Sequence, residues 1–298
     1  MSALALLVAC LLLGWLAARF GKPPASLAQN LNWFVLNIAY SALVLSLIPK
    51  LQFDWELWYA VAALWFVFVG SWLLFSFLGR VLHWSRERVG ALTLLGGLGN
   101  TSFIGFPMIE ALRGQEALKI ALIADQVGCF VALSVGGTIV ASIYSGRSVA
   151  PLNIARRVLT FPPFISLLVG LGVGALGGWP AMIDGILLRL GGTLVPLALF
   201  SVGLQLKLSI APGQLTAMSL GLGWKLLLAP AIVFGIGFMM SVDPLILTVA
   251  VLESAMAPMI SATILANQYN LEPRLANTLL GVGILLSLIT VPIANALL

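Results

Sequence analysis

The chain has 298 residues, of which 61% are hydrophobic and only 8% are charged, and its formal net charge is +5. A soluble domain carries about 25% charged residues, so the few charged side chains here cannot coat a water-soluble fold, and the low net charge also excludes disorder. A membrane β-barrel is disfavoured, because the apolar runs are about twice as long as the roughly 10 residues of a barrel strand. The composition therefore predicts an all-α membrane protein.

Ten apolar runs follow one another along the chain, most of them close to the length of about 20 residues that a spanning helix needs. They cover residues 2–18, 29–49, 57–79, 89–112, 117–143, 160–179, 184–206, 213–240, 244–268 and 274–297. We therefore expect ten transmembrane helices. The basic residues are scattered over the short connections, which is typical of topology signals and not of a nucleic-acid surface.

The distribution of basic residues predicts the orientation in the membrane. Connections that follow the odd-numbered helices hold ten Lys or Arg residues, whereas those on the opposite side hold four. The positive-inside rule places the first set in the cytoplasm. Both termini of this multi-pass inner-membrane or plasma-membrane protein are then expected outside the cytoplasm.

The chain divides into two halves that resemble each other. Residues 1–146 and 160–298 hold five predicted helices each, joined by a cytoplasmic linker at 147–159. An odd number per half gives the halves opposite topologies, as in inverted-repeat transporters. The segments 41–53 and 196–208 align without a gap, which sets Ser46 on Ser201 and Leu51 on Leu206.

The fourth helix of each half is interrupted. It reads Gly96-Gly-Leu-Gly-Asn-Thr-Ser-Phe-Ile-Gly-Phe-Pro107 in the first half and Glu253-Ser-Ala-Met-Ala-Pro-Met-Ile-Ser261 in the second. Proline removes a helical hydrogen bond, and paired interruptions point to a binding site at the membrane midplane. The free N–H groups and positive dipoles of broken helix ends suit an anion. The alternative is a pair of proline kinks without a ligand.

The interrupted segments resemble those of the auxin efflux carrier family. Gly99-Asn-Thr-Ser-Phe-Ile-Gly-Phe-Pro107 is similar to the Gly-Asn-x-x-Phe-x-Gly-x-Pro signature of that family, and Ala255-Met-Ala-Pro258 is similar to the Ala-Met-x-Pro segment of its ninth helix. Segments 195–206 and 276–292 resemble its seventh and last helices. One departure is Ser41, where the family often has proline.

The resemblance implies a fold and an activity. The fold has two inverted five-helix repeats, in which helices 4 and 9 are broken and cross near the membrane centre. Helices 1, 2, 6 and 7 form a scaffold, and helices 3–5 and 8–10 form a transport domain that moves like an elevator. The substrates are small organic anions such as malate, malonate or auxin-like acids, and analogy with plant members adds a homodimer.

The first substrate-binding candidates are Asn100, Thr101 and Ser102, because an amide and hydroxyls can hold a carboxylate without a permanent buried charge. The alternative role for them is to cap the two half-helices. The complete set of substrate-binding candidates also includes the neighbouring residues of both interrupted segments, namely Gly105, Pro107, Ser254 and Pro258.

A second group consists of coupling or charge-relay candidates inside the membrane, where an ionisable residue is costly and by default a functional hypothesis. Asp125, with its neighbour Gln126, is a proton site, a partner of Lys225, or an acid near the membrane interface that reaches water. Lys225 attracts an anion, replaces a bound cation beside the crossing, or forms a structural ion pair. Glu253 titrates during transport or binds loosened N–H groups.

We expect no cofactor, no metal and no enzymatic activity. His83 is the only histidine and lies in a predicted connection, while Cys10 and Cys129 lie in apolar runs as packing residues. The sequence therefore predicts a secondary carrier of small organic anions in the lipid bilayer. The alternatives are a sodium-coupled bile-acid-type symporter of the same architecture and a channel or transporter-like receptor. Coupling to protons, to sodium or to neither is left open.

Overall fold

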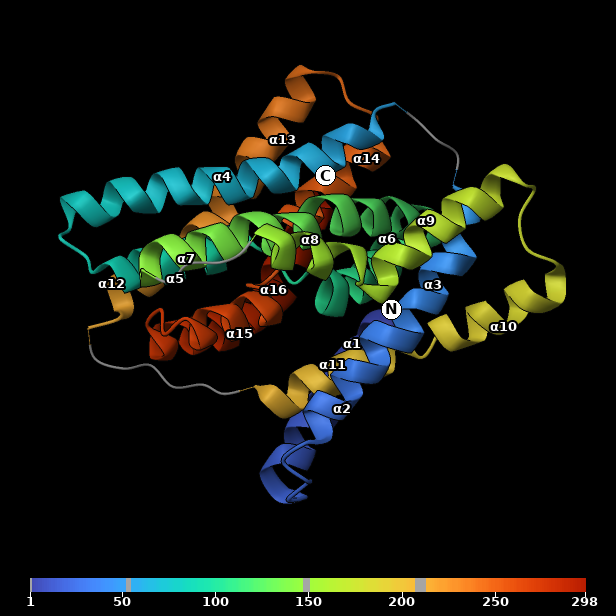
Figure 1. Ribbon diagram of the computed structural model, residues 1–298, viewed down its shortest axis with the longest axis horizontal. Coiled ribbons are helices and arrows are strands. Elements are labelled where there is room, and N and C mark those ends of the chain that lie inside the picture. Colours follow the sequence, from blue (N-terminus) through green and yellow to red (C-terminus); the bar gives the residue numbers. More distant parts are fainter. Residues whose placement is uncertain (1, 52–54, 147–150, 207–212) are drawn as a thin grey trace. The chain divides into compact units, whose positions relative to one another are not determined.

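The structure is a computed structural model that describes the whole chain except residues 1, 52–54, 147–150 and 207–212 (Figure 1). The described residues form helices and short connections, and the only strand-like pairing among them is one isolated bridge. Six helical stretches are long and apolar enough to cross a membrane, namely Leu27–Lys50, Leu57–Val81, Thr101–Ser145, Ala181–Gln205, Leu215–Met239 and Pro273–Leu297. The all-helical class is thus confirmed, whereas the count of ten spans and the inverted repeat stay predictions.

The chain forms two compact units, and each takes segments from both halves of the sequence. The first unit contains residues 1–54, 102–122 and 156–206, and the second contains residues 55–101, 123–155 and 207–298. The units are therefore distinct from the two halves that the sequence comparison delimits.

The first unit is built around a close helix crossing. Its helices are α1 (Ser2–Phe20), α2 (Leu27–Phe34), η1 (Val35–Ala39), α3 (Tyr40–Leu47), η2 (Ile48–Lys50), α9 (Pro162–Ala175), α10 (Ala181–Gly191) and α11 (Leu194–Gln205). In Figure 1, α1 and α11 lie side by side. A Cβ atom at Gly203 would lie 2.2 Å from the backbone oxygen of Leu11. Glycine is therefore required for this backbone approach, as small residues often are between membrane helices.

The two aligned serines of the first unit make reciprocal contacts. The Ser46 hydroxyl donates to Asp184 of α10 at 2.9 Å, and Asp184 also pairs with Lys50 at 2.6 Å. The Ser201 hydroxyl of α11 lies 2.6 Å from the Asn32 side-chain oxygen of α2. Each serine thus binds the apolar helical stretch that contains the other.

The second unit holds the remaining long helices. They are α4 (Leu57–Val81), α5 (Arg86–Gly97), η4 (Ala124–Phe130), η5 (Ala132–Gly137), α7 (Thr138–Ser145), α12 (Leu215–Gly223), η6 (Trp224–Leu228), α13 (Ala229–Met239), α14 (Pro244–Ser254), α15 (Ile260–Gln268) and α16 (Pro273–Leu297). Helix α4 runs beside α5 and α14 (Figure 1). Buried Phe68 and Phe75 of α4 contact the backbone positions of Gly96, Gly97 and Gly136.

The connection expected between the runs 89–112 and 117–143 is very short. Helix η3 (Thr101–Gly105) leads into α6 (Phe106–Ile123), and the break within α6 lies inside the expected connection. Gly114 has φ 80°, so the helix breaks there and the stretch Thr101–Ser145 consists of two helices that meet at this glycine. The predicted linker 147–159 contains the short helix α8 (Pro151–Leu159).

Candidate functional site

Both interrupted helices of the sequence prediction are broken in the structure. Helix α5 ends at Gly97 and helical structure resumes with η3 at Thr101. Helix α14 ends at Ser254 and α15 begins at Ile260. The prediction of two interruptions, made from Gly and Pro placement, is confirmed at both positions.

The two unwound segments cross and pair through their main chains. Gly99 and Pro258 form an isolated antiparallel bridge. The Asn100 N–H donates to the Ala257 oxygen at 2.7 Å, and the Met259 N–H donates to the Leu98 oxygen at 3.0 Å. Backbone groups inside a membrane need internal partners, and each broken helix here supplies them for the other. We call residues 98–100 and 257–259 the crossing.

Two glycines leave room for the neighbours of the crossing. A Cβ atom at Gly99 would lie 3.0 Å from Lys225 Nζ. On the other segment, a Cβ atom at Gly283 of α16 would lie 2.4 Å from Cδ of Pro258. The crossing is therefore packed directly against a lysine side chain and against the backbone of α16.

Lys225 is the fully buried cation of this site. It lies in η6, between α12 and α13, and its Nζ donates to the Ser254 oxygen at 3.0 Å. That oxygen belongs to the last turn of α14, where the helix dipole favours a positive charge. The ammonium group thus stabilises the broken end of α14. It does not form the ion pair with the Glu253 carboxylate that was one alternative of the sequence prediction.

Asp125 lies beside the first broken helix. Its carboxylate accepts a hydrogen bond from the Thr101 hydroxyl, and both side chains are buried. One turn later, the Cys129 thiol donates to the Gly99 oxygen at 3.2 Å. The sequence analysis treated Cys129 as a packing residue only. Its spacing of four residues from Asp125 would have indicated that both side chains face the same segment.

Glu253 and Gln126 carry the unsatisfied polar groups of the site. Both side chains are fully buried, and within the described part of the chain neither Glu253 carboxylate oxygen, and neither polar atom of Gln126, has a hydrogen-bond partner. Glu253 also experiences the charges of Asp125 and Lys225. A buried polar group without a partner costs about 1–3 kcal/mol, so these two groups are the ones for which a ligand or a proton would relieve a penalty.

The remaining candidates are buried, but they divide between the units. The Ser254 hydroxyl donates to the Ala250 oxygen of its own helix at 2.7 Å. Asn100 and Thr101 belong to the second unit, together with Asp125, Gln126, Lys225, Glu253, Ser254 and Pro258. Ser102, Gly105 and Pro107 belong to the first unit. The structure therefore brings the coupling candidates and most substrate candidates into one unit.

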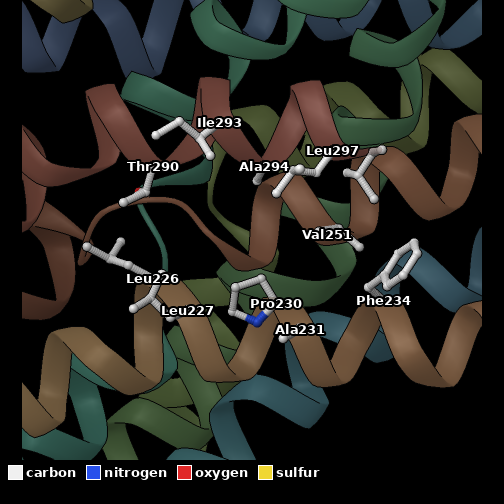
Figure 2. Close-up of a pocket in the computed structure, with 11 residues that line it drawn as sticks. Leu226, Leu227, Pro230, Ala231, Phe234, Val251, Thr290, Ile293, Ala294 and Leu297 are labelled. Atoms are coloured by element: carbon white, nitrogen blue, oxygen red, sulfur yellow. The ribbon is translucent and has the colours of Figure 1, made fainter.

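A groove of about 410 Å³ lies on the same unit, and its lining contains no charged side chain. Figure 2 shows Pro230 and Phe234 of α13 on one side of the groove and Ile293 and Leu297 of α16 on the other. Val251 of α14 also lines it. The lining side chains are apolar apart from Thr290. A carboxylate would lose its hydration there without compensation, so the crossing, not the groove, is the candidate anion site.

No three His, Cys, Asp or Glu side chains gather in the described ranges as a metal site would require. The polar groups at and beside the crossing are instead one ammonium, two carboxyl groups, two amides, two hydroxyls and a thiol. Such a set can hold an organic anion next to the cation and can exchange a proton at a carboxyl group.

Comparison with known proteins agrees with the transporter architecture. An uncharacterized transporter of Methanothermobacter thermautotrophicus is 26% identical over 295 residues, which cover 96% of this chain and 94% of that protein. An uncharacterized transporter of Methanocaldococcus jannaschii is 27% identical over 282 residues, which cover 89% and 87%. The family described as membrane transport protein matches residues 1–294. The chain therefore belongs to the membrane transport protein family, the auxin efflux carrier family that its broken-helix motifs resemble.

Proposed function

We propose that the protein is a secondary carrier that moves small organic anions, carboxylates such as malate, malonate or auxin-like acids, across the inner or plasma membrane. The observation that carries the proposal is the crossing, in which two broken helices meet beside the buried ammonium of Lys225. Paired broken helices form binding sites in inverted-repeat transporters. A fully buried cation next to them supplies the charge that a carboxylate needs.

Elevator-type alternating access is part of the proposal. The first compact unit contains α1–α3 and α9–α11, the elements that correspond to the expected scaffold helices 1, 2, 6 and 7, together with residues 102–122. The second unit contains the rest of the expected transport helices, including the crossing and its charged groups, while residues 102–122 of the expected helices 4 and 5 belong to the first unit. This partition supports a mechanism in which one unit carries the substrate and the other stays fixed in the membrane.

Lys225 and Glu253 favour proton coupling over sodium coupling. A sodium site in such a crossing is built from backbone and carboxylate oxygens. Here the Lys225 ammonium already binds the Ser254 oxygen at the broken end of α14, so it takes the place of a metal cation. Glu253 has unpartnered carboxylate oxygens next to it, and we assign the coupled proton to this group.

The test is uptake of radiolabelled carboxylates into proteoliposomes under imposed proton, sodium and voltage gradients. We expect saturable uptake that Asn100→Ala reduces at least about tenfold, equivalent to about 1.4 kcal/mol of binding. Asn277→Ala is the matched control, because this exposed asparagine of α16 bonds to the Pro273 oxygen of its own helix turn and to Asn267, away from the crossing residues.

Three outcomes separate the alternatives. Equal uptake by the Asn100 and Asn277 variants would remove the crossing as the substrate site. Uptake that needs a sodium gradient would replace the proton proposal with a sodium-coupled symporter. A folded protein that binds carboxylates without moving them would point to a receptor, and unitary currents would point to a channel.

A further inference from the structure

Helix α8 (Pro151–Leu159) has the clearest amphipathic pattern of the short helices. At 3.6 residues per turn, its apolar residues fall on an arc of about 160° and its polar residues on the opposite side. The apolar positions are Pro151, Leu152, Ile154, Ala155, Val158 and Leu159, and the polar positions are Asn153, Arg156 and Arg157. An uninterrupted arc of this kind in nine residues indicates a helix that lies between two environments.

One edge of the apolar arc has no cover in the structure. Leu152 is 77% exposed and Leu159 is 62% exposed. The two side chains are seven residues apart, which places them on the same side of the helix. Ile154 and Val158, on the other edge, are half-buried. The helix thus rests on the protein with one edge and presents two leucines outward with the other.

The neighbouring helices hold α8 at the edge of the membrane. Helix α7 ends at Ser145, at the end of an apolar stretch long enough to span a bilayer, and the apolar α9 begins at Pro162. Only Thr160 and Phe161 separate α8 from α9. Two residues allow at most about 10 Å between the helix ends, so the C-terminal end of α8 stays close to the start of the apolar α9.

The charge around α8 is of one sign. The chain has no acidic residue between Asp125 and Asp184, and the charged residues between these two are Arg147, Arg156 and Arg157. Arginines at the border of an apolar arc extend their heads to lipid phosphates while their stems lie along the apolar surface. A patch of arginines close to the membrane is attracted to anionic lipids, an attraction that acidic neighbours would weaken.

We propose that α8 is an interfacial helix that docks on the anionic phospholipid surface of the membrane, on the side predicted to be cytoplasmic. Leu152 and Leu159 enter the boundary between head groups and acyl chains, and the exposed Arg156 binds lipid phosphate. The boundary between the two compact units falls within α8, between Ala155 and Arg156. The docked helix therefore ties the connection between the units to one leaflet.

The experiment measures the depth of α8 with the full-length protein in lipid vesicles. A fluorophore sensitive to its surroundings is attached at Leu152→Cys and, as the matched control, at Thr160→Cys. The Thr160 N–H still bonds to the Arg156 oxygen at 2.9 Å, so Thr160 continues the helical turn of α8. Its position then falls on the polar side of the helix. Native Cys10 and Cys129 are buried, so the introduced thiol takes the label. The vesicles contain phosphatidylcholine, alone or mixed with phosphatidylglycerol, and nitroxide-bearing lipids as quenchers.

We expect the label at position 152 to be quenched by the nitroxide lipids and the label at position 160 to be quenched by water-soluble iodide. The lipid quenching should be lost without phosphatidylglycerol and in the Arg156→Gln/Arg157→Gln variant. Equal iodide quenching at both positions would overturn the proposal, as would protection of position 152 from both quenchers, which would mean that protein covers it. Lipid quenching at position 152 that does not depend on phosphatidylglycerol would overturn the preference for anionic lipids. None of these readouts requires transport.

Discussion

Replacing Gly283 by alanine should disrupt the crossing without touching any charged group. Gly283 lies in α16, directly behind Pro258. An added Cβ atom would lie 2.4 Å from Cδ of the proline, about 1 Å short of the 3.4 Å at which ordinary contact begins. The proline ring is rigid and its backbone belongs to the crossing, so the strain is passed on to the main chain.

The size of the effect follows from the hydrogen bonds of the crossing. The Asn100 N–H bonds to the Ala257 oxygen at 2.7 Å, and a shift of about 1 Å in the segment that contains Pro258 would break this bond. Overpacking costs about 1–3 kcal/mol, and the two bonds of the crossing contribute about 1–3 kcal/mol together. A loss of about 3 kcal/mol in the transport-competent geometry would lower its population about 100-fold.

The assay is carboxylate uptake together with the thermal unfolding midpoint of the purified protein. Gly235→Ala is the matched control, because a Cβ atom at Gly235 of α13 would meet nothing within 4 Å. The Gly283→Ala variant should lose uptake and stability, whereas the control should keep both. Adding Pro258→Ala to Gly283→Ala should restore part of the stability, since the alanine then has no ring to strike. Wild-type uptake and an unchanged midpoint in Gly283→Ala would refute the reasoning.

Three further predictions concern stability and coupling. Gly203→Ala should lower the unfolding midpoint by about 4–8 °C, because the added methyl group overpacks the contact between α1 and α11 at a cost of about 2 kcal/mol. Gly172→Ala should leave the midpoint unchanged, because a Cβ atom at Gly172 meets only open space. Arg88→Gln, which removes a bidentate and partly buried ion pair, should cost about 1 kcal/mol, and Lys119→Gln, whose partner is exposed, much less; equal losses would contradict this difference. Glu253→Gln should keep anion exchange but lose its acceleration by a proton gradient, and retained acceleration would assign the proton elsewhere.

The broken helices could be predicted from the sequence because their cause is local. Pro258 and the glycines around Asn100 weaken a helix at their own positions, and the breaks lie at these residues. The partners of the freed backbone groups could not be predicted in the same way. The pairing of residues 98–100 with 257–259 depends on how two distant segments meet, and periodicity contains no information about that.

The charged groups were predicted as a set, but their contacts were not. Their apolar surroundings marked Asp125, Lys225 and Glu253 as intramembrane residues. Sequence reasoning offered an ion pair for Lys225, whereas the structure gives it the Ser254 oxygen. The reason is the unwinding of α14, which exposes a carbonyl group that an unbroken helix would have used internally.

Helix α8 escaped the sequence analysis for a different reason. Nine residues are too short to register as a membrane span, and the arginines marked the segment as a connection. The periodicity of its leucines carried the missing signal. The break at Gly114, by contrast, lies between the two predicted apolar runs, where a glycine can adopt the φ of 80° that interrupts the helix.

The crossing is held by main-chain atoms, and this separates architecture from substrate choice. The bonds from Asn100 to Ala257 and from Met259 to Leu98 use only N–H and C=O groups, which every residue except proline supplies. Substitutions along these segments can therefore change the chemistry offered to a solute while the frame persists. A family whose members share only about a quarter of their residues, as this chain does with two archaeal relatives, can in this way evolve new cargo preferences on one unaltered backbone.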